Sequence, residues 1–143
     1  MLLLKLADVD LDKNIIIGGM KTKSGFRRSV PVHHRIIQLV KDFYNEATEY
    51  GSEWLINSET AHTKNMTYDQ YKYRFGNVIR SLALVNEHRP HDCRKTFITR
   101  LKKAGASDGA IKRLVGHKIT DITEGIYTDR DVEWLREDVE KLE

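Results

Sequence analysis

The amino-acid sequence predicts a mostly helical α+β fold, in which a small three-stranded antiparallel sheet lies on one side of a helical core. A β-branched run at residues 14–17 and a returning segment at 26–30 predict a hairpin. Residues 54–56, Trp-Leu-Ile, predict a third short strand. From residue 33 onwards, apolar residues recur at intervals of three and four, which is typical of amphipathic helices.

The composition is that of one soluble domain. The chain has 143 residues, 40% of them hydrophobic and 31% charged, which is enough for a single core. No apolar run approaches the ~18 residues of a membrane span, and the first residues do not form a signal peptide, so we expect a cytoplasmic protein. The one cysteine, Cys93, excludes an internal disulfide and is expected to be a small buried side chain.

Charge is distributed unevenly along the chain. Residues 129–143 contain seven acidic and three basic residues, a net charge of −4, so residues 1–128 carry +7 and the whole chain +3. A basic body favours a polyanion such as DNA as the partner, while an acidic tail favours a surface that is turned away from DNA or docked on a basic neighbour.

The first half of the chain is expected to run helix, hairpin, helix. Residues 1–10 begin with apolar residues and no capping residue, as if inside a helix, and the hairpin after them has a lysine-rich tip. Apolar periodicity predicts a helix over 33–47. His33 and His34 open it, and we interpret them as first-turn surface residues. The sequence around them offers too few further ligands, so no metal site is expected.

The second half is expected to be helical. A capping box at Thr67 and Gln70 starts a helix that reaches residue 82, and its apolar stripe is expected to lie in the core. That stripe consists of Tyr68, Tyr71, Phe75, Val78, Ile79 and Leu82. Basic residues off the stripe either contact phosphates or form a solvated face; they are Lys72, Arg74 and Arg80.

Three shorter helices are expected over 91–104, 107–115 and 131–142. In the first, Arg94 should lie at the edge of the buried face, held by packing yet open to a ligand. In the second, Lys112 and Arg113 are expected to be exposed.

The stretch from His91 to Tyr127 carries the chemistry. His91 and Arg94 are three positions apart, so on a helix they share a face and both reach one anionic group. Gly116 permits a backbone reversal that would aim His117 at this pair, and Tyr127 lies ten residues further on. An arginine fork, two imidazoles and a phenol suit a phosphodiester substrate.

This ordered set resembles the catalytic half of the tyrosine recombinase (phage integrase) family. Residues 91–94, His-Asp-Cys-Arg, match the family's His-x-x-Arg, and residues 114–117, Leu-Val-Gly-His, match its Leu-Gly-His. Tyr127 matches its nucleophile. The family's general-acid lysine lies on a hairpin, eight residues before the proline of a Val-Pro pair, which is Lys23 here, with Lys21 as the neighbouring alternative.

The resemblance implies an integrase-like catalytic domain of a phage or mobile element in a bacterial host. Such domains break and rejoin double-stranded DNA through a 3′-phosphotyrosyl intermediate, without a metal or other cofactor. Tyr127 would be the nucleophile, Arg94 would stabilise the phosphate charge and Lys23 would protonate the leaving oxygen. His91 and His117 would hydrogen-bond to phosphate. The residues expected to contact DNA are Lys21, Arg27, Arg28, Arg89, Lys95 and Lys118.

The family also implies partners. Full-length members work as tetramers on paired DNA sites, and their C-terminal helix docks on its own domain or on a neighbouring protomer. One family residue has no counterpart here, because a further arginine, in an Arg-x-x-Glu-Leu segment, would lie about three residues before Met1. We therefore expect residues 1–143 to be a catalytic domain truncated at its N-terminus, without this arginine and without the preceding DNA-binding domains.

Three rival functions remain open. A non-catalytic helix-turn-helix module would explain the basic charge and the stretch from Gly105 to Tyr127, which is typical of two short helices around a glycine turn, but not His91, Arg94 and Lys23. A metal-dependent phosphoesterase that used His91, His117 and Asp121 would have too few carboxylates at ligand spacing. A type IB topoisomerase would use similar chemistry, but the short span between motifs is more typical of an integrase.

The absent arginine leads to a first prediction. Loss of one preorganised donor costs ~3 to 4 kcal/mol, so residues 1–143 alone should form a covalent adduct with a nicked suicide DNA substrate ~100- to 1000-fold more slowly than a chain that includes the arginine. The measurement is the rate at which protein and DNA become covalently linked on denaturing gels. Equal rates for the two chains would contradict the prediction.

Overall fold

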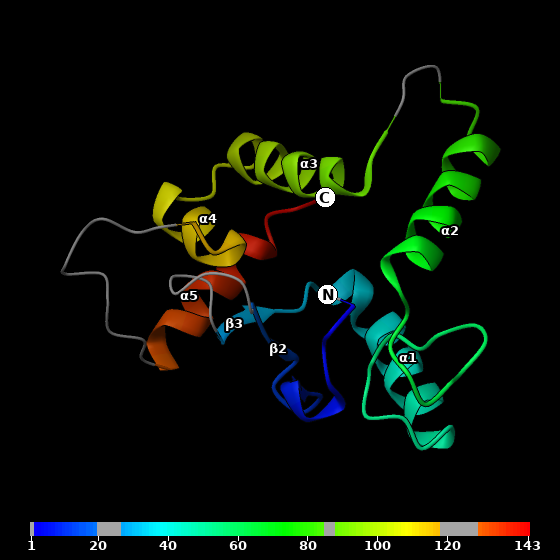
Figure 1. Ribbon diagram of the computed structural model, residues 1–143. Helices are drawn as coiled ribbons and strands as arrows, with labels where there is room; N and C mark the ends of the chain where they lie inside the picture. The colour runs from blue at the N-terminus through cyan, green and yellow to red at the C-terminus, as the bar shows by residue number, and fades with distance from the viewer. Residues whose placement is uncertain (1, 20–26, 85–87, 118–128) are drawn as a thin grey trace.

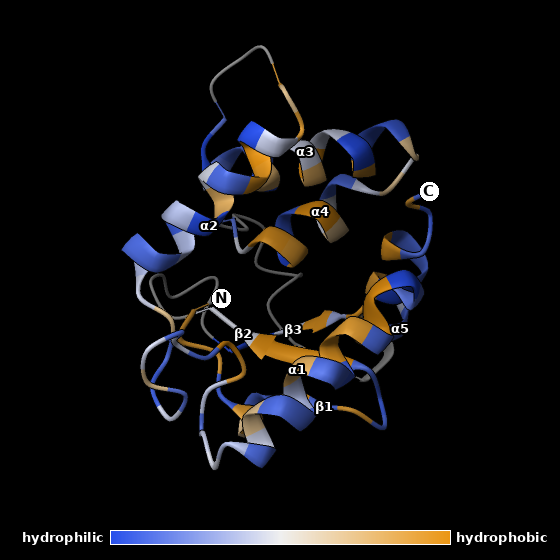
Figure 2. Cartoon of the chain, turned by 90° about the vertical axis from the view of Figure 1, so that its right-hand side faces the viewer, coloured by the Kyte–Doolittle hydropathy of each residue, from blue (hydrophilic) through white to orange (hydrophobic). Residues whose placement is uncertain are grey.

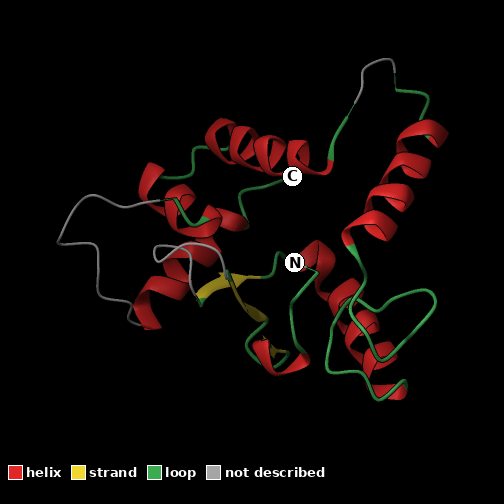
Figure 3. Ribbon diagram, in the orientation of Figure 1, coloured by secondary structure: helices red, strands yellow, loops and turns green. Residues whose placement is uncertain are grey.

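The computed structural model describes residues 2–19, 27–84, 88–117 and 129–143, and helices dominate it (Figure 3). The elements in chain order are η1 (Leu6–Asp8), β1 (Val9–Asp10), β2 (Ile15–Gly18), β3 (Arg28–Pro31), η3 (His34–Ile36), α1 (Ile37–Glu49), α2 (Tyr68–Ser81), α3 (Pro90–Lys103), α4 (Asp108–Val115) and α5 (Asp129–Val139). The mostly helical α+β fold with a three-stranded antiparallel sheet is confirmed. Within these segments, no helix is both long and apolar enough to cross a membrane.

The sheet has the order β1-β2-β3, and the predicted hairpin forms its β2–β3 pair, with Ile16 opposite Val30. The third strand was predicted in the wrong place. It is β1, which pairs Val9 with Ile16, and not residues 54–56. Trp54 forms only an isolated bridge with Lys5.

The expected helix over residues 1–10 is also wrong. Lys5 has an extended backbone, η1 spans three residues, and the chain then enters β1. The backbone groups of this segment instead find partners in the segment around Trp54. The N–H of Leu6 donates to the carbonyl of Glu53 at 2.9 Å, and the N–H of Leu55 donates to the carbonyl of Leu4 at 2.9 Å. This pairing satisfies backbone groups that a helix would otherwise have bonded internally.

The core lies between α3, α4, α5 and β3, which gather on one side of the molecule (Figure 1). Its side chains come mainly from the predicted apolar stripes, and the hydrophobic colour in Figure 2 concentrates on α4, α5 and the strands. Leu101 of α3 and Leu135 of α5 are fully buried. The buried cluster comprises Leu101, Ala110, Ile111, Leu114, Leu135 and Val139.

Helix α2 lies apart from this core (Figure 1). The capping box at Thr67 and Gln70 is present, but none of the residues of α2, all of which are described, is buried. Tyr68, Val78 and Leu82 are exposed, so the prediction that the stripe of α2 lies in the core is wrong. The aromatic periodicity was a correct signal for a helix and not for its burial, because α2 has no helix of the core packed along it.

Two further burial predictions are wrong. Cys93 is exposed, although it lies on the same stripe of α3 as Phe97 and Leu101, because it is near the start of the helix, before the part that packs on the core. Arg113 was expected to be exposed but retains only 6% of its accessible surface. Its guanidinium carbon lies 5.3 Å from the centroid of the Trp134 ring, and this cation–π stacking accommodates a buried cation beside α5.

Helix α5 docks on its own chain against β3 and α4. Besides Leu135 and Val139, it buries Asp138, whose carboxylate accepts hydrogen bonds from the N–H of Ser107 at 3.1 Å and from its hydroxyl at 2.8 Å. Burial alone would raise the pKa of Asp138, but Lys141 and the Ser107 donors outweigh it and hold the pKa below its usual value. The residue that caps α4 is thus tied to α5 by an ionised carboxylate.

The core packing predicts a large cost for truncation of α5's central leucine. Leu135→Ala removes a fully buried side chain and should lower the free energy of unfolding by about 2–5 kcal/mol. Leu39→Ala, on the exposed face of α1, should change it by about 0.5 kcal/mol or less. Urea denaturation measures both, and equal costs would contradict the placement of α5 in the core.

Candidate functional site

The turn that carries His117 begins at the C-terminal end of α4. Gly116 has left-handed backbone angles, φ 70° and ψ 38°. Its N–H donates to the carbonyl of Arg113 at 3.1 Å, and the N–H of His117 donates to the carbonyl of Lys112 at 2.9 Å. This pair of bonds is a Schellman motif, in which glycine is favoured because it has no Cβ. The predicted reversal at Gly116 is therefore present, and it leaves His117 exposed at the end of the helix.

Two arginines converge on the same helix end. The guanidinium of Arg94, from α3, donates to the carbonyl of Val115. The Nε–H of Arg28, from β3, donates to the carbonyl of Leu114 at 3.0 Å. The last carbonyls of a helix carry partial negative charge, so cations are stabilised there. The half-buried Arg94 therefore contacts Val115, which lies two positions before His117 in the Leu-Val-Gly-His motif. The sequence predicted this motif as the partner of Arg94.

The first turn of α3 presents His91. Pro90 is well placed at the first helical position, and Asp92 accepts a hydrogen bond from the N–H of Arg89 at 2.8 Å, which closes the turn. That bond, together with the ammonium of Lys95 at 3.2 Å, holds the pKa of Asp92 below its usual value. His91 is exposed and lies one turn before Arg94 on α3.

A comparison of the sequence with models of protein families identifies the family of this chain. The model of the phage integrase family matches residues 1–133, which is nearly the whole chain. The chain belongs to the phage integrase family. Neither the curated proteins nor the solved structures gave a match. These residues are thus a tyrosine recombinase domain of the integrase type, and DNA is the substrate that the family implies.

Of the five predicted catalytic residues, Arg94 contacts the carbonyl of Val115 at the end of α4, and His117 follows the Gly116 turn there. His91 lies three positions before Arg94 on α3. Lys23 and Tyr127 lie outside the described residues. The same holds for Lys21 and Lys118 among the predicted DNA contacts.

The other predicted DNA contacts are described. Arg89 and Lys95 are exposed beside His91. Arg27 is exposed and has a positive φ of 50°, with its guanidinium 3.9 Å from the carboxylate of Asp8. Arg28 is half-buried and bonds to Leu114, a role in joining β3 to α4 that sequence reasoning missed. No local pattern marks that role, because the two residues are 86 positions apart.

A cavity of about 560 Å³ lies between α2 and the start of α3. Three of its lining residues are lysine or arginine, and for two of these, Lys72 and Arg80, the sequence left open whether they contact phosphates or are only solvated. Both line this hollow, together with Arg89 from the start of α3. The full lining is Tyr68, Lys72, Gly76, Ile79, Arg80, His88, Arg89 and Pro90. The cavity gives the integrase domain a positively charged recess next to the turn that bears His91.

The integrase domain also contains a group of side chains that could hold a metal ion. His33, His34 and Glu140 form the one such group found among the residues that the structure describes. The expectation that both histidines are first-turn surface residues holds for His34 only, since the His33 side chain is just 11% exposed. The expected lack of further ligands fails because Glu140 arrives from the other end of the chain. Burial alone would raise the pKa of Glu140, but hydrogen bonds from His34 outweigh burial and hold the pKa below its usual value. This carboxyl group is therefore ionised at neutral pH.

The turn geometry yields a prediction. Gly116→Ala forces a Cβ into the left-handed region and should lower the free energy of unfolding by about 1–2 kcal/mol. Gly18→Ala is the matched control, because a Cβ at Gly18 meets no atom within 4 Å and should change that free energy by about 0.5 kcal/mol or less. Urea denaturation compares the two. A tolerated alanine at 116 would show that His117 does not depend on this turn.

Proposed function

We propose that this domain is the catalytic part of a site-specific recombinase, which cuts and rejoins double-stranded DNA through a 3′-phosphotyrosyl intermediate. The observation that carries the proposal is the contact of Arg94 with the carbonyl of Val115, because it unites the His-x-x-Arg helix with the Leu-Val-Gly-His turn. Family membership supplies the reaction type, and this contact supports the use of the matching residues for that reaction.

In the proposed reaction, the Tyr127 hydroxyl attacks the phosphorus of the scissile diester. The new bond joins the tyrosine oxygen to the 3′ phosphate, and the bond from phosphorus to the 5′ oxygen breaks. Lys23 donates a proton to that leaving oxygen, and His91 accepts the proton of the phenol, whose ordinary pKa near ~10 makes it a poor nucleophile without help. Reversal with a different 5′ hydroxyl rejoins the strands.

Arg94 and His117 act on the phosphate oxygens. A guanidinium matches two non-bridging oxygens with parallel hydrogen bonds, and its charge stabilises the negative charge that develops as the tyrosine attacks. Arg94 is suited to this role because one of its N–H groups is already engaged by a helix carbonyl, so the fork is held in place before DNA arrives.

The basic recess between α2 and α3 supports the binding of duplex DNA by its phosphates. Lys72, Arg80 and Arg89 line it, and Lys95, further along α3, is exposed. Phosphate contacts of this kind fix the register of a protein on DNA. Assembly into a tetramer on paired sites is the quaternary arrangement that we propose for the full-length protein.

Replacement of the nucleophile separates this function from that of a non-catalytic DNA-binding module. Tyr127→Phe removes the attacking oxygen, so no covalent adduct should accumulate on a nicked suicide substrate, even on prolonged incubation. Affinity for the same DNA, measured by gel mobility shift, should change by about two-fold or less, because the phenol contributes little to phosphate binding.

The matched control is Tyr73→Phe, which removes the hydroxyl of an exposed tyrosine on α2 and should leave adduct formation unchanged. A module that only binds DNA would give no adduct with any of these proteins. An adduct that persists in Tyr127→Phe would assign the nucleophile to another residue.

A further inference from the structure

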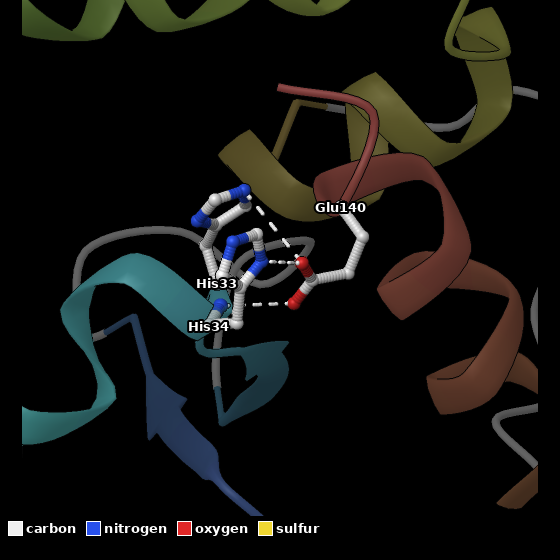
Figure 4. A group of neighbouring side chains, drawn as sticks. All are labelled: His33, His34 and Glu140. Atoms are coloured by element: carbon white, nitrogen blue, oxygen red, sulfur yellow. Dashed lines mark hydrogen bonds and ion pairs between the residues drawn. The ribbon is translucent and has the colours of Figure 1, made fainter. Parts of the chain in front are cut away.

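The segment that leads into α1 and the C-terminal end of the chain meet at a cluster of three side chains. His33 caps η3, His34 follows it, and Glu140 lies immediately after α5 (Figure 4). The Glu140 carboxylate accepts a hydrogen bond from the N–H of His34 at 2.9 Å and also contacts the Nδ1 of His34. The Nε2 of His33 lies 3.6 Å from the same carboxylate. Both rings therefore turn towards one carboxylate group.

We propose that His33, His34 and Glu140 bind one divalent cation of the zinc class, which joins the start of α1 to the end of α5. None of these three residues belongs to the set that we propose for DNA cleavage, so the inference does not depend on the proposed function.

The positions of the ligand atoms support the proposal. One nitrogen or oxygen from each residue lies within 4.8 Å of the other two. Ligand atoms around tetrahedral zinc, each at ~2.0–2.2 Å from the ion, are ~3.3 Å apart, so side-chain rotations that move an atom by roughly 1 Å complete the site. The backbone already restrains these residues, because the N–H of His34 fixes one carboxylate oxygen.

The chemistry of the ligands favours zinc over magnesium or calcium. Two imidazoles and one carboxylate are ligands typical of zinc, cobalt and nickel, whereas magnesium and calcium prefer oxygen alone. The carbonyl of Leu142 lies 2.9 Å from the Nε2 of His33 and could serve as a fourth ligand, as could water, since the His34 side chain is 65% exposed.

The ring of His33 shows what metal binding must displace. Its Nδ1 accepts the N–H of Arg35 at 3.2 Å, so in the neutral ring Nε2 carries the proton and donates it to the Leu142 carbonyl. A cation at Nε2 moves that proton to Nδ1, which ends the bond from Arg35. Two hydrogen bonds, the one from Arg35 and the one to the Leu142 carbonyl, are exchanged for a metal–nitrogen bond. Because the protonated Nδ1 then faces the N–H of Arg35, the His33 ring must turn away from that N–H when it coordinates the ion.

Cobalt and zinc titrations of the whole chain, after removal of metals with a chelator, test the site. Wild-type protein should bind one Zn²⁺ per chain by calorimetry, and Co²⁺ should give the visible absorption bands of a four- or five-coordinate complex. Zn²⁺ should also raise the Tm. His34→Gln and Glu140→Gln should each weaken Zn²⁺ binding by about ten-fold or more, because each removes a direct ligand.

The control is His62→Gln. His62 is exposed, stacks on Tyr50 and lies outside the cluster. The affinity of this variant for Zn²⁺ should stay within about two-fold of that of the wild type, because distant sites act independently. Wild-type protein that gives no Co²⁺ bands at a several-fold molar excess would overturn the proposal, whatever the variants do. Binding that survives intact in both cluster variants would overturn it as well, by assigning the ion to other residues.

Discussion

The carbonyl end of α4 is the point on which the arrangement of this domain depends. Three parts of the chain meet there: β3 through Arg28, α3 through Arg94, and the His117 turn through Gly116. Four backbone carbonyls at the end of any helix lack partners within the helix and carry partial negative charge. Here two guanidiniums and a Schellman turn satisfy them. A requirement of helix chemistry thus places cationic and imidazole side chains close together at the surface.

The bond to a helix carbonyl explains how Arg94 can hold the structure together and still have N–H groups free to bind an anion. A half-buried arginine whose N–H groups were all satisfied by protein would have none left for phosphate, and a fully exposed one would be too mobile to bind a transition state well. The carbonyl of Val115 engages one side of the guanidinium. The planar group has five N–H donors in all, so others remain to hydrogen-bond to an anion.

The sequence predicted the elements from which the core is built better than it predicted their partners. Apolar stripes gave the helices near their observed bounds, and the β-branched run at 14–17 gave the hairpin. The third strand was misplaced because β1 has only two residues, too few to show the alternation that marks a strand. Arg113 was misassigned for a different reason, since its burial depends on Trp134 from another helix.

Some residues of the candidate site could likewise be predicted from local patterns, and others could not. His91, Arg94 and His117 could be selected because their spacing on helices and turns is local. The contact of Arg28 with Leu114 and the approach of Glu140 to His33 could not, because the partners are 86 and more than 100 positions apart. Periodicity reports which face of an element is apolar; it does not report which other element covers that face or which polar groups meet at its edge.

The docking of α5 limits how this domain could exchange its C-terminal helix with another protomer. Release of α5 would expose Leu135 and Val139, at a cost of roughly 3–6 kcal/mol, and would leave the N–H groups of Ser107 and His34 without their carboxylate partners. Docking on the same chain is the arrangement observed. Exchange would therefore require the neighbouring protomer to offer an equivalent apolar groove and equivalent donors, which a second copy of this chain does by symmetry. The cost then reduces to the strain and ordering of the segment that leads into α5, so the balance between the two forms is set by that connection more than by the helix interface.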